Sequence, residues 1–166
     1  MSPDAPVPLF RISLQHGCDP GSFVPAHLMS PDASVPFFPI SLQQGYDPAA
    51  HFALGRALAP LRDEGVLIVG SGLSYHNLRL FGPEAKIPSA AFDAWLAEVM
   101  ALPAAAHTAT LMAWDQAPYA RVCHKQEDHF VPLFAALGAA EGEVARMVYH
   151  DDNLYGGVTA SSYRIG

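Results

Sequence analysis

The stretch DPAAHFALGRALAPLRDEGVLIVGSGLSYHN, residues 47–77, decides the fold class. Asp47 followed by Pro48 is typical of a helix start, and leucines recur behind it at helical spacing, which predicts a helix over about 48–62. The run VLIVG at 66–70 is short, apolar and β-branched, as in a central strand covered on both faces. A helix that leads directly into such a strand predicts an α/β protein.

The remainder of the chain continues this alternation of helices and strands. One helix is predicted from Ser89 until Pro103 stops it, and another from near Pro132 with Gly138 as its C-terminal cap. The runs VARMVYH and GVTASSYRI are predicted as strands. We therefore expect an α/β fold in which a mixed or mostly parallel central sheet carries helices on both faces.

The first part of the chain contains a duplication. Residues 2–20 and 30–48 agree at 14 of 19 positions. Each copy holds an apolar run followed by Gly and Asp-Pro, which is typical of a strand that leaves into a turn and a helix start. Because we expect only one copy to occupy a native strand position, we predict that the second copy is integrated. Residues 1–29 would then be a poorly packed N-terminal arm, and residues 30–166 the domain.

Composition limits the classes of function. The chain of 166 residues is 51% hydrophobic, too apolar for disorder, and its net charge of -7 gives no basic surface for nucleic acid or an anionic membrane. Its apolar runs are far shorter than the ~20 residues of a membrane span. With two cysteines and no leader pattern at its start, the sequence predicts a protein of the reducing cytoplasm.

Histidines supply the candidate site residues. His76 follows the predicted strand, where ligands bind in open α/β sheets, so it is either a proton-transfer group or metal ligand, or a histidine that only caps the turn. His129 precedes a predicted helix, where the dipole favours the neutral imidazole that binds metal; a solvated turn is the alternative. His124 fits no closed zinc pattern. Ser74 with His76 leaves an esterase as a further reading, although no G-x-S-x-G elbow is present.

Four segments together resemble one known family: LMSPDASVPFFPISLQ, DPAAHFALGRALAPLRDEGVLIVGSGLSYHNLR, EDHFVPLFAALGAA and GVTASSYRIG. From about Gly17 to Gly166, the chain resembles the class III extradiol ring-cleavage dioxygenases of the LigB-type superfamily, in particular the DOPA-dioxygenase-like branch. The resemblance implies an oxidoreductase with one Fe(II) or Zn(II) ion that acts on a catechol-type substrate such as DOPA with O₂. It also implies that His76 is catalytic or part of the metal site and that His129 is a metal ligand. His124 matches no ligand position, and we expect it only to support the ligands.

Departures from the family pattern bear on the expected activity. Family members are longer and carry upstream an HG-P motif and a further histidine, which implies that this chain is truncated at the N-terminus and that its domain is incomplete. In place of a family D-H-G motif stand Asp19, Pro20 and Gly21, so that a ring without a donor replaces an imidazole.

With fewer ligands, we expect weak metal binding and slow turnover or none. Two hypotheses stay open, a dioxygenase and a catalytically inactive remnant that acts as an interaction module. Strand edges uncovered by the truncation would favour a homo-oligomer.

Overall fold

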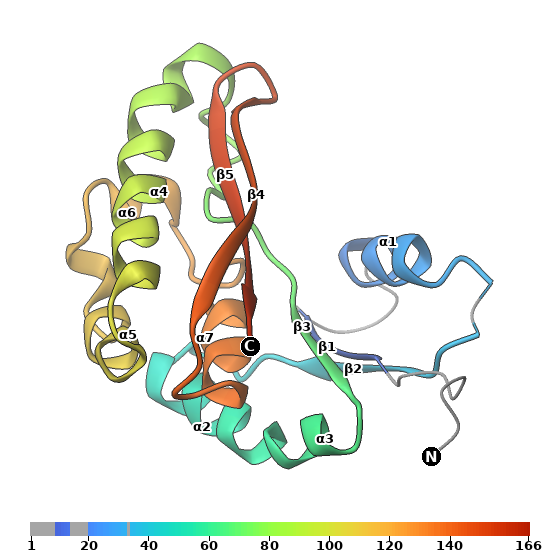
Figure 1. Ribbon diagram of the computed structural model, residues 1–166. Helices are drawn as coiled ribbons and strands as arrows, with labels where there is room; N and C mark the ends of the chain where they lie inside the picture. Colours follow the sequence, from blue (N-terminus) through green and yellow to red (C-terminus); the bar gives the residue numbers. More distant parts are fainter. Residues whose placement is uncertain (1–8, 14–19, 33) are drawn as a thin grey trace. The chain divides into compact units, whose positions relative to one another are not determined.

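The computed structural model describes residues 9–13, 20–32 and 34–166, which form two compact units. Unit 1 contains the described residues up to Gly72 together with Val131–Ala139, and unit 2 contains Leu73–Phe130 and Ala140–Gly166. Both units combine helices with strands, in agreement with the predicted α/β class (Figure 1). Every helix in the described ranges is too short or too polar to span a bilayer.

Unit 1 is built on a parallel sheet with the strand order β2-β1-β3. Its elements in chain order are β1 (Leu9–Ser13), α1 (Pro20–Met29), β2 (Phe37–Ser41), α2 (Pro48–Leu58), α3 (Pro60–Asp63), β3 (Leu67–Gly70) and α7 (Val131–Ala139). The helix predicted over 48–62 is therefore divided before Pro60, which starts α3. Strand β3 lies at an edge, and the central position predicted for the VLIVG run is wrong because β1 occupies it.

The two copies of the duplication supply neighbouring strands. Leu9 pairs with Phe37 and Ser13 with Ser41, so every residue of β1 lies beside its own equivalent in β2. Helix α1 makes the crossover that parallel neighbours require. The expectation that only one copy occupies a strand position is wrong, because both copies form strands. Two similar apolar runs can hydrogen-bond to each other through their backbone N–H and C=O groups. The division into an arm and a domain at residue 30 stays a prediction.

Helices α2 and α7 pack against each other at backbone contact. Phe52 and Phe134 stack with their ring centroids 5.4 Å apart. A Cβ on Gly55 would meet the backbone of α7, including the nitrogen of Ala139 at 2.7 Å. Gly138 faces the backbone of Phe52 in the same way. Gly138 therefore lies inside the helix instead of capping its end as predicted, and it is needed there for close approach.

Unit 2 packs helices against an antiparallel hairpin. Its elements are the short 3₁₀ turns η1 (Gly82–Ala85) and η2 (Trp114–Gln116), the helices α4 (Lys86–Ala101), α5 (Ala104–Leu111) and α6 (Ala120–Cys123), and the strands β4 (Ala145–Leu154) and β5 (Val158–Ile165). The two predicted strands are confirmed as this hairpin. The Ser89 hydroxyl donates to the carbonyl of Ala85 within the helical segment and accepts from the backbone N–H of Thr159 in β5 at 2.9 Å. The described strands thus form two small sheets, not one central sheet.

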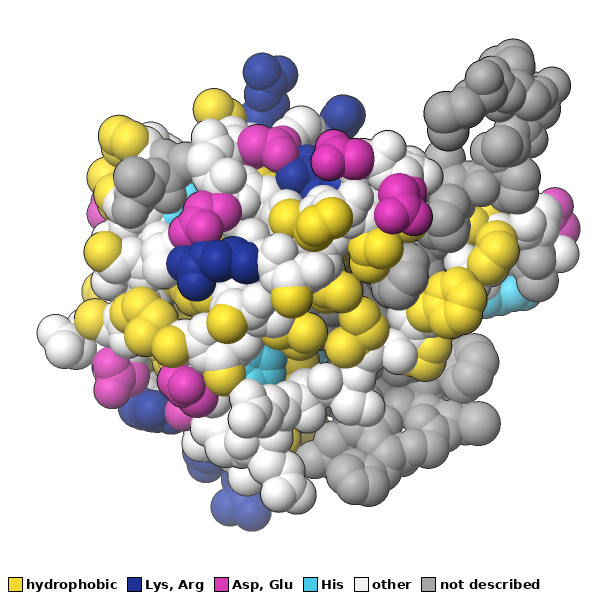
Figure 2. Space-filling model, turned by 90° about the horizontal axis from the view of Figure 1, so that it is seen from below, with side chains coloured by type: hydrophobic (Ala, Val, Ile, Leu, Met, Phe, Trp, Pro, Cys, Tyr) yellow, Lys and Arg dark blue, Asp and Glu magenta, His cyan; other side chains and the backbone are white. Residues whose placement is uncertain are grey.

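Large apolar side chains remain exposed in both units. They include Phe38 and Leu67 in the sheet of unit 1, and Val148 and Tyr149 in the hairpin of unit 2. Figure 2 shows apolar side chains, in yellow, spread over the face that is seen from below. Exposed apolar groups on short sheets are compatible with association between chains. A homo-oligomer stays a prediction.

A histidine lies in the core of unit 2. His124 is 0% exposed, and its ring centroid lies 5.3, 5.9 and 5.0 Å from those of Phe92, Trp114 and Phe130. Its Nε2 is 2.9 Å from the carbonyl oxygen of Ser74, which can only accept, so Nε2 carries the proton. Among the residues that the structure describes, the buried Nδ1 has no hydrogen-bond partner. Burial lowers the pKa of His124 to about 4, which keeps the ring neutral at pH 7.

We expect Gly55→Ala to lower the free energy of unfolding by about 1–3 kcal/mol, because the new methyl group would press on the backbone of α7. In an exposed helix interior the same change raises stability by about 1 kcal/mol, so the sign of the effect is decisive. Urea denaturation measures it. Ala53→Ser, at an exposed position of α2, is the control and should shift stability by less than about 0.5 kcal/mol. A gain in stability from Gly55→Ala would contradict the close approach.

The buried imidazole of His124 predicts a pH dependence of stability. Its pKa is about 4 in the folded chain against an ordinary value of 6.5, so below pH 6.5 the unfolded chain binds the proton more readily. Stability is therefore complete above about pH 6.5 and falls as the pH drops towards 4, by about 3 kcal/mol in all. His124→Gln removes this titration, so between pH 7 and pH 5 the variant should lose less stability than the native chain.

The control for this experiment is His27→Gln at an exposed position of α1, which should keep the native pH dependence. Urea denaturation at several pH values supplies the measurement for both variants. Identical pH profiles for His124→Gln and the native chain would show that His124 does not resist protonation in the folded state.

Candidate metal centre

His76 lies on an extended segment whose backbone is fixed by its neighbour in space. The backbone N–H of His76 donates to the carbonyl of Cys123 at 2.9 Å, and His76 forms an isolated parallel bridge with His124. The side-chain amide of Asn77 donates to the carbonyl of Val122 at 2.8 Å. All of these residues belong to unit 2. The segment that carries His76 is thus tied to the end of α6 from both sides of the histidine.

Asp128 and His129 lie in a turn that follows α6. The backbone N–H of Phe130 donates to the carbonyl of Glu127 at 2.8 Å and closes this turn. Phe130 is buried and anchors one end of the turn in the core. At the other end the carboxylate of Glu127 pairs with Arg121 at 2.7 Å. The turn therefore presents Asp128 and His129 from a fixed backbone.

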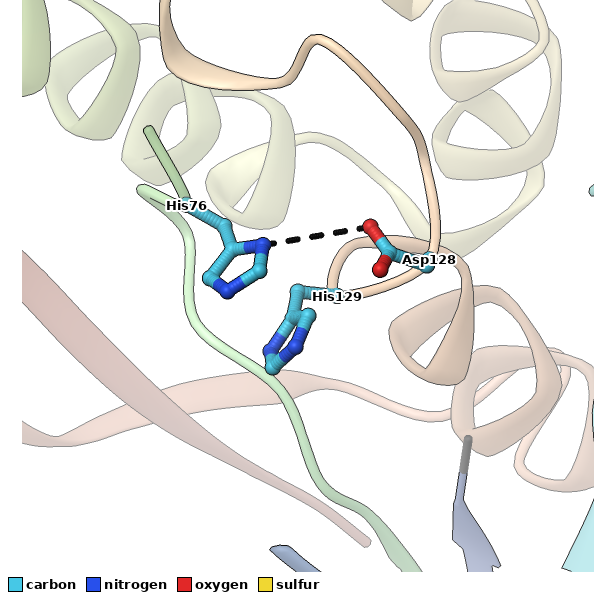
Figure 3. A group of neighbouring side chains, drawn as sticks. All are labelled: His76, Asp128 and His129. Atoms are coloured by element: carbon cyan, nitrogen blue, oxygen red, sulfur yellow. Dashed lines mark ion pairs between the residues drawn. The ribbon is translucent and has the colours of Figure 1, made fainter. Parts of the chain in front are cut away.

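The side chains of His76, Asp128 and His129 converge (Figure 3). The two imidazole rings stack with their centroids 3.4 Å apart and their planes inclined by 22°. Asp128 Oδ1 lies 3.9 Å from His76 Nδ1. One potential ligand atom from each residue lies within 4.8 Å of the others, and all three side chains are half-buried. The structure thus brings together the two histidines that the sequence singled out, while their roles stay predictions.

The electrostatics of this cluster favour a cation. Among the described residues, Asp128 Oδ1 is buried and accepts no hydrogen bond, and burying a carboxylate oxygen without one is costly. Neutral imidazole, with a free ring nitrogen, is the form in which histidine binds a metal ion. Two imidazoles and one carboxylate are the donor set of many non-haem Fe(II) oxygenases, and zinc accepts the same ligands. His76 and Asp128 keep 20% and 19% of their side-chain surface exposed, which leaves the cluster open to small molecules.

Asp128 is the site residue that sequence reasoning missed. Its only signal was its place beside His129 in the EDH sequence, and adjacent residues often point in different directions. His124 lies outside the cluster, in the core behind His76.

The esterase reading is not supported by the contacts of Ser74. Among the described contacts the Ser74 hydroxyl donates to Asp93 Oδ1 at 3.5 Å, and none joins it to His76. The predicted loss of an imidazole at residues 19–21 is not tested. Asp19 lies outside the described residues, and Pro20 begins α1.

Known proteins resemble this chain in sequence. Residues 6–166 match the family described as the catalytic LigB subunit of aromatic ring-opening dioxygenase. The 4,5-DOPA dioxygenase extradiol of Beta vulgaris is 38% identical over 140 residues, which cover 82% of this chain and 52% of that protein. Dioxygenase tasH of Hapsidospora irregularis is 34% identical over 163 residues, covering 90% of this chain and 50% of its own. The chain spans about half the length of the curated relatives it matches.

The fold has a counterpart among solved structures. The crystal structure of an uncharacterized protein from Escherichia coli K12 matches with a TM-score of 0.83 at 21% sequence identity, over 97% of this chain and 86% of that one. The family match extends over nearly the whole sequence, and the two curated relatives are named as dioxygenases, which are oxidoreductases. The chain therefore belongs to the LigB family of aromatic ring-opening dioxygenases.

Proposed function

We propose that this chain is a metal-dependent extradiol dioxygenase for catechol-type substrates such as DOPA, with one ion held by His76, Asp128 and His129. The observation that carries the proposal is the convergence of these three side chains in a LigB-family chain. The names of its relatives support the substrate class, since several are 4,5-DOPA dioxygenases. The half-buried position of the cluster supports access by a small aromatic molecule.

The donor set fits the metal that the family implies. Within the described ranges, Asp128 Oδ1 is a buried acceptor that receives no hydrogen bond, and a divalent cation would satisfy it. Imidazole and carboxylate ligands suit both Fe(II) and Zn(II). When bound, iron would supply Lewis acidity toward the catechol oxygens and electron exchange with O₂, whereas zinc would supply the Lewis acidity alone.

The protein's own contribution is to orient groups around the substrate. The pairing of His76 with Cys123 and His124 fixes the backbone that carries one ring, and the turn closed at Phe130 fixes the backbone on the other side of the cluster. Ligands fixed in this way lose little freedom when substrate binds. Asp128 offers its carboxylate beside His76 Nδ1, so that a proton or a cation located there meets a negative charge.

His76 has a second possible role, which is to accept the proton of the substrate hydroxyl. One ring nitrogen cannot bind an ion and take up a proton at the same time, so the roles give different results. We expect His76→Ala and His129→Ala each to weaken Co(II) or Zn(II) binding by more than the about 10- to 100-fold typical of residues behind the ligands. Calorimetric titration measures this. If His76→Ala alone keeps native metal affinity, His76 is the proton acceptor and not a ligand.

We expect the Fe(II)-loaded chain to consume O₂ slowly when DOPA is added and the Zn(II)-loaded chain to consume none, because zinc has no redox chemistry. An oxygen electrode measures the uptake. His129→Ala should abolish it, whereas His27→Ala, a change at an exposed histidine of α1, should leave it unchanged.

Two results would contradict these expectations. A chain that binds Fe(II) but shows no DOPA-dependent oxygen uptake would refute the proposed activity and leave the inactive remnant as the explanation. Sub-micromolar metal affinity with steady oxygen uptake would instead refute the expectation that this chain is a weak enzyme.

A further inference from the structure

We infer that His124 is a positioning residue, whose imidazole holds the segment Ser74–Asn77 so that the ring of His76 reaches Asp128 and His129. The inference deepens the proposed metal centre and rests on it. One of its two tests needs no metal, however, so the two can fail separately.

Three hydrogen bonds tie the His76 segment to residues 122–124. The His124 ring donates from Nε2 to the carbonyl of Ser74 at 2.9 Å, two residues before His76. The N–H of His76 itself donates to Cys123 at 2.9 Å, and the Asn77 side chain donates to Val122 at 2.8 Å. His76 is therefore held before, at and after its own position. The bond from His124 is the one of these three that holds the residue two positions before His76.

Packing alone does not explain a histidine at position 124. The ring is fully buried between aromatic neighbours, and in the described part of the chain its Nδ1 has no hydrogen-bond partner. A phenyl ring would fill much the same space without burying an unpaired nitrogen. What an imidazole adds is the N–H that reaches the Ser74 carbonyl. The hydrogen bond to Ser74 thus explains why a polar ring is buried at position 124.

The cluster requires this degree of support. The rings of His76 and His129 stack at a centroid distance of 3.4 Å, which leaves little room for displacement of either ring. Ligands generally need to be held within about 0.5 Å of their working positions by the residues behind them. Releasing the Ser74 carbonyl removes one of the hydrogen bonds that hold the backbone two residues before His76. We therefore expect the His76 ring to move first when the bond is lost.

Three variants test the inference. His124→Phe keeps an aromatic ring and removes the donor, whereas His124→Gln keeps an N–H near the Nε2 position. His107→Phe is the matched control, because His107 is also buried and its Nε2 lies 2.9 Å from a backbone carbonyl, that of Leu102. Both phenylalanine variants lose a buried bond of the same kind. Only the first loses a bond to the His76 segment.

The first readout is proton NMR of the imidazole rings in the metal-free chain. Stacked rings shift each other's ring-proton signals upfield, so His76 and His129 should show displaced signals in the native protein. We expect His124→Phe to move them toward unstacked positions, and His124→Gln and His107→Phe to leave them in place. Unchanged signals in His124→Phe would overturn the inference, as would equal changes in His107→Phe.

The second readout is Co(II) titration followed by its absorption spectrum, with thermal unfolding of each variant as the measure of folding. We expect His124→Phe to weaken Co(II) binding about 10- to 100-fold, and His124→Gln and His107→Phe to match the native chain. Equal losses of affinity in both phenylalanine variants would overturn the inference.

The role of His124 can still be tested if His124→Phe does not fold or if the native chain binds no Co(II). If His124→Phe does not fold, His124→Asn replaces it, because its shorter amide cannot reach Ser74, and it should differ from His124→Gln in the same two readouts. If the native chain binds no Co(II), the proposed function fails, and the ring signals alone decide on His124.

Discussion

Unit 2 and its candidate site depend on the pairing between two segments that lie about 50 residues apart in the sequence, Ser74–Asn77 and Val122–His124. Backbone and side-chain hydrogen bonds run between them, and the aromatic core closes over the second segment. Asp128 and His129 follow that segment within one turn, so the same pairing brings them to His76. The chemistry of the site is therefore set by a short stretch of backbone pairing more than by any single side chain.

Much of the local structure could be predicted from the sequence. The Asp-Pro signal marks the start of α2, since the Asp47 carboxylate accepts from the backbone N–H groups of Ala49 and Ala50. The two runs near the C-terminus form the predicted strands, and these pair as an antiparallel hairpin. Long-range order was harder to predict. The edge position of β3 depends on where the first copy of the duplication packs, and an apolar run alone does not reveal which strand lies in the centre.

The candidate site shows the same division. His76 and His129 were found because histidine at a strand end or before a helix has a chemical meaning that residue type and position disclose. Asp128 was not, because whether a carboxylate beside a histidine points with it or away from it depends on the turn closed by Phe130. Gly138 was misread for a similar reason. A glycine near a helix end suits a cap as well as a close approach, and only the position of Phe52 in α2 distinguishes them.

Because β1 and β2 pair with equivalent residues side by side, either run is similar enough in sequence to form the central strand of the sheet in unit 1. Two runs that differ at only two of five positions, LFRIS and FFPIS, could exchange places with little change in their backbone pairing. Pro39 breaks this degeneracy, because a residue without an N–H loses a ladder bond between two neighbours but not on an outer edge. Of two near-identical strands, the one that carries the imino acid is thus the outer one, where its missing N–H costs least.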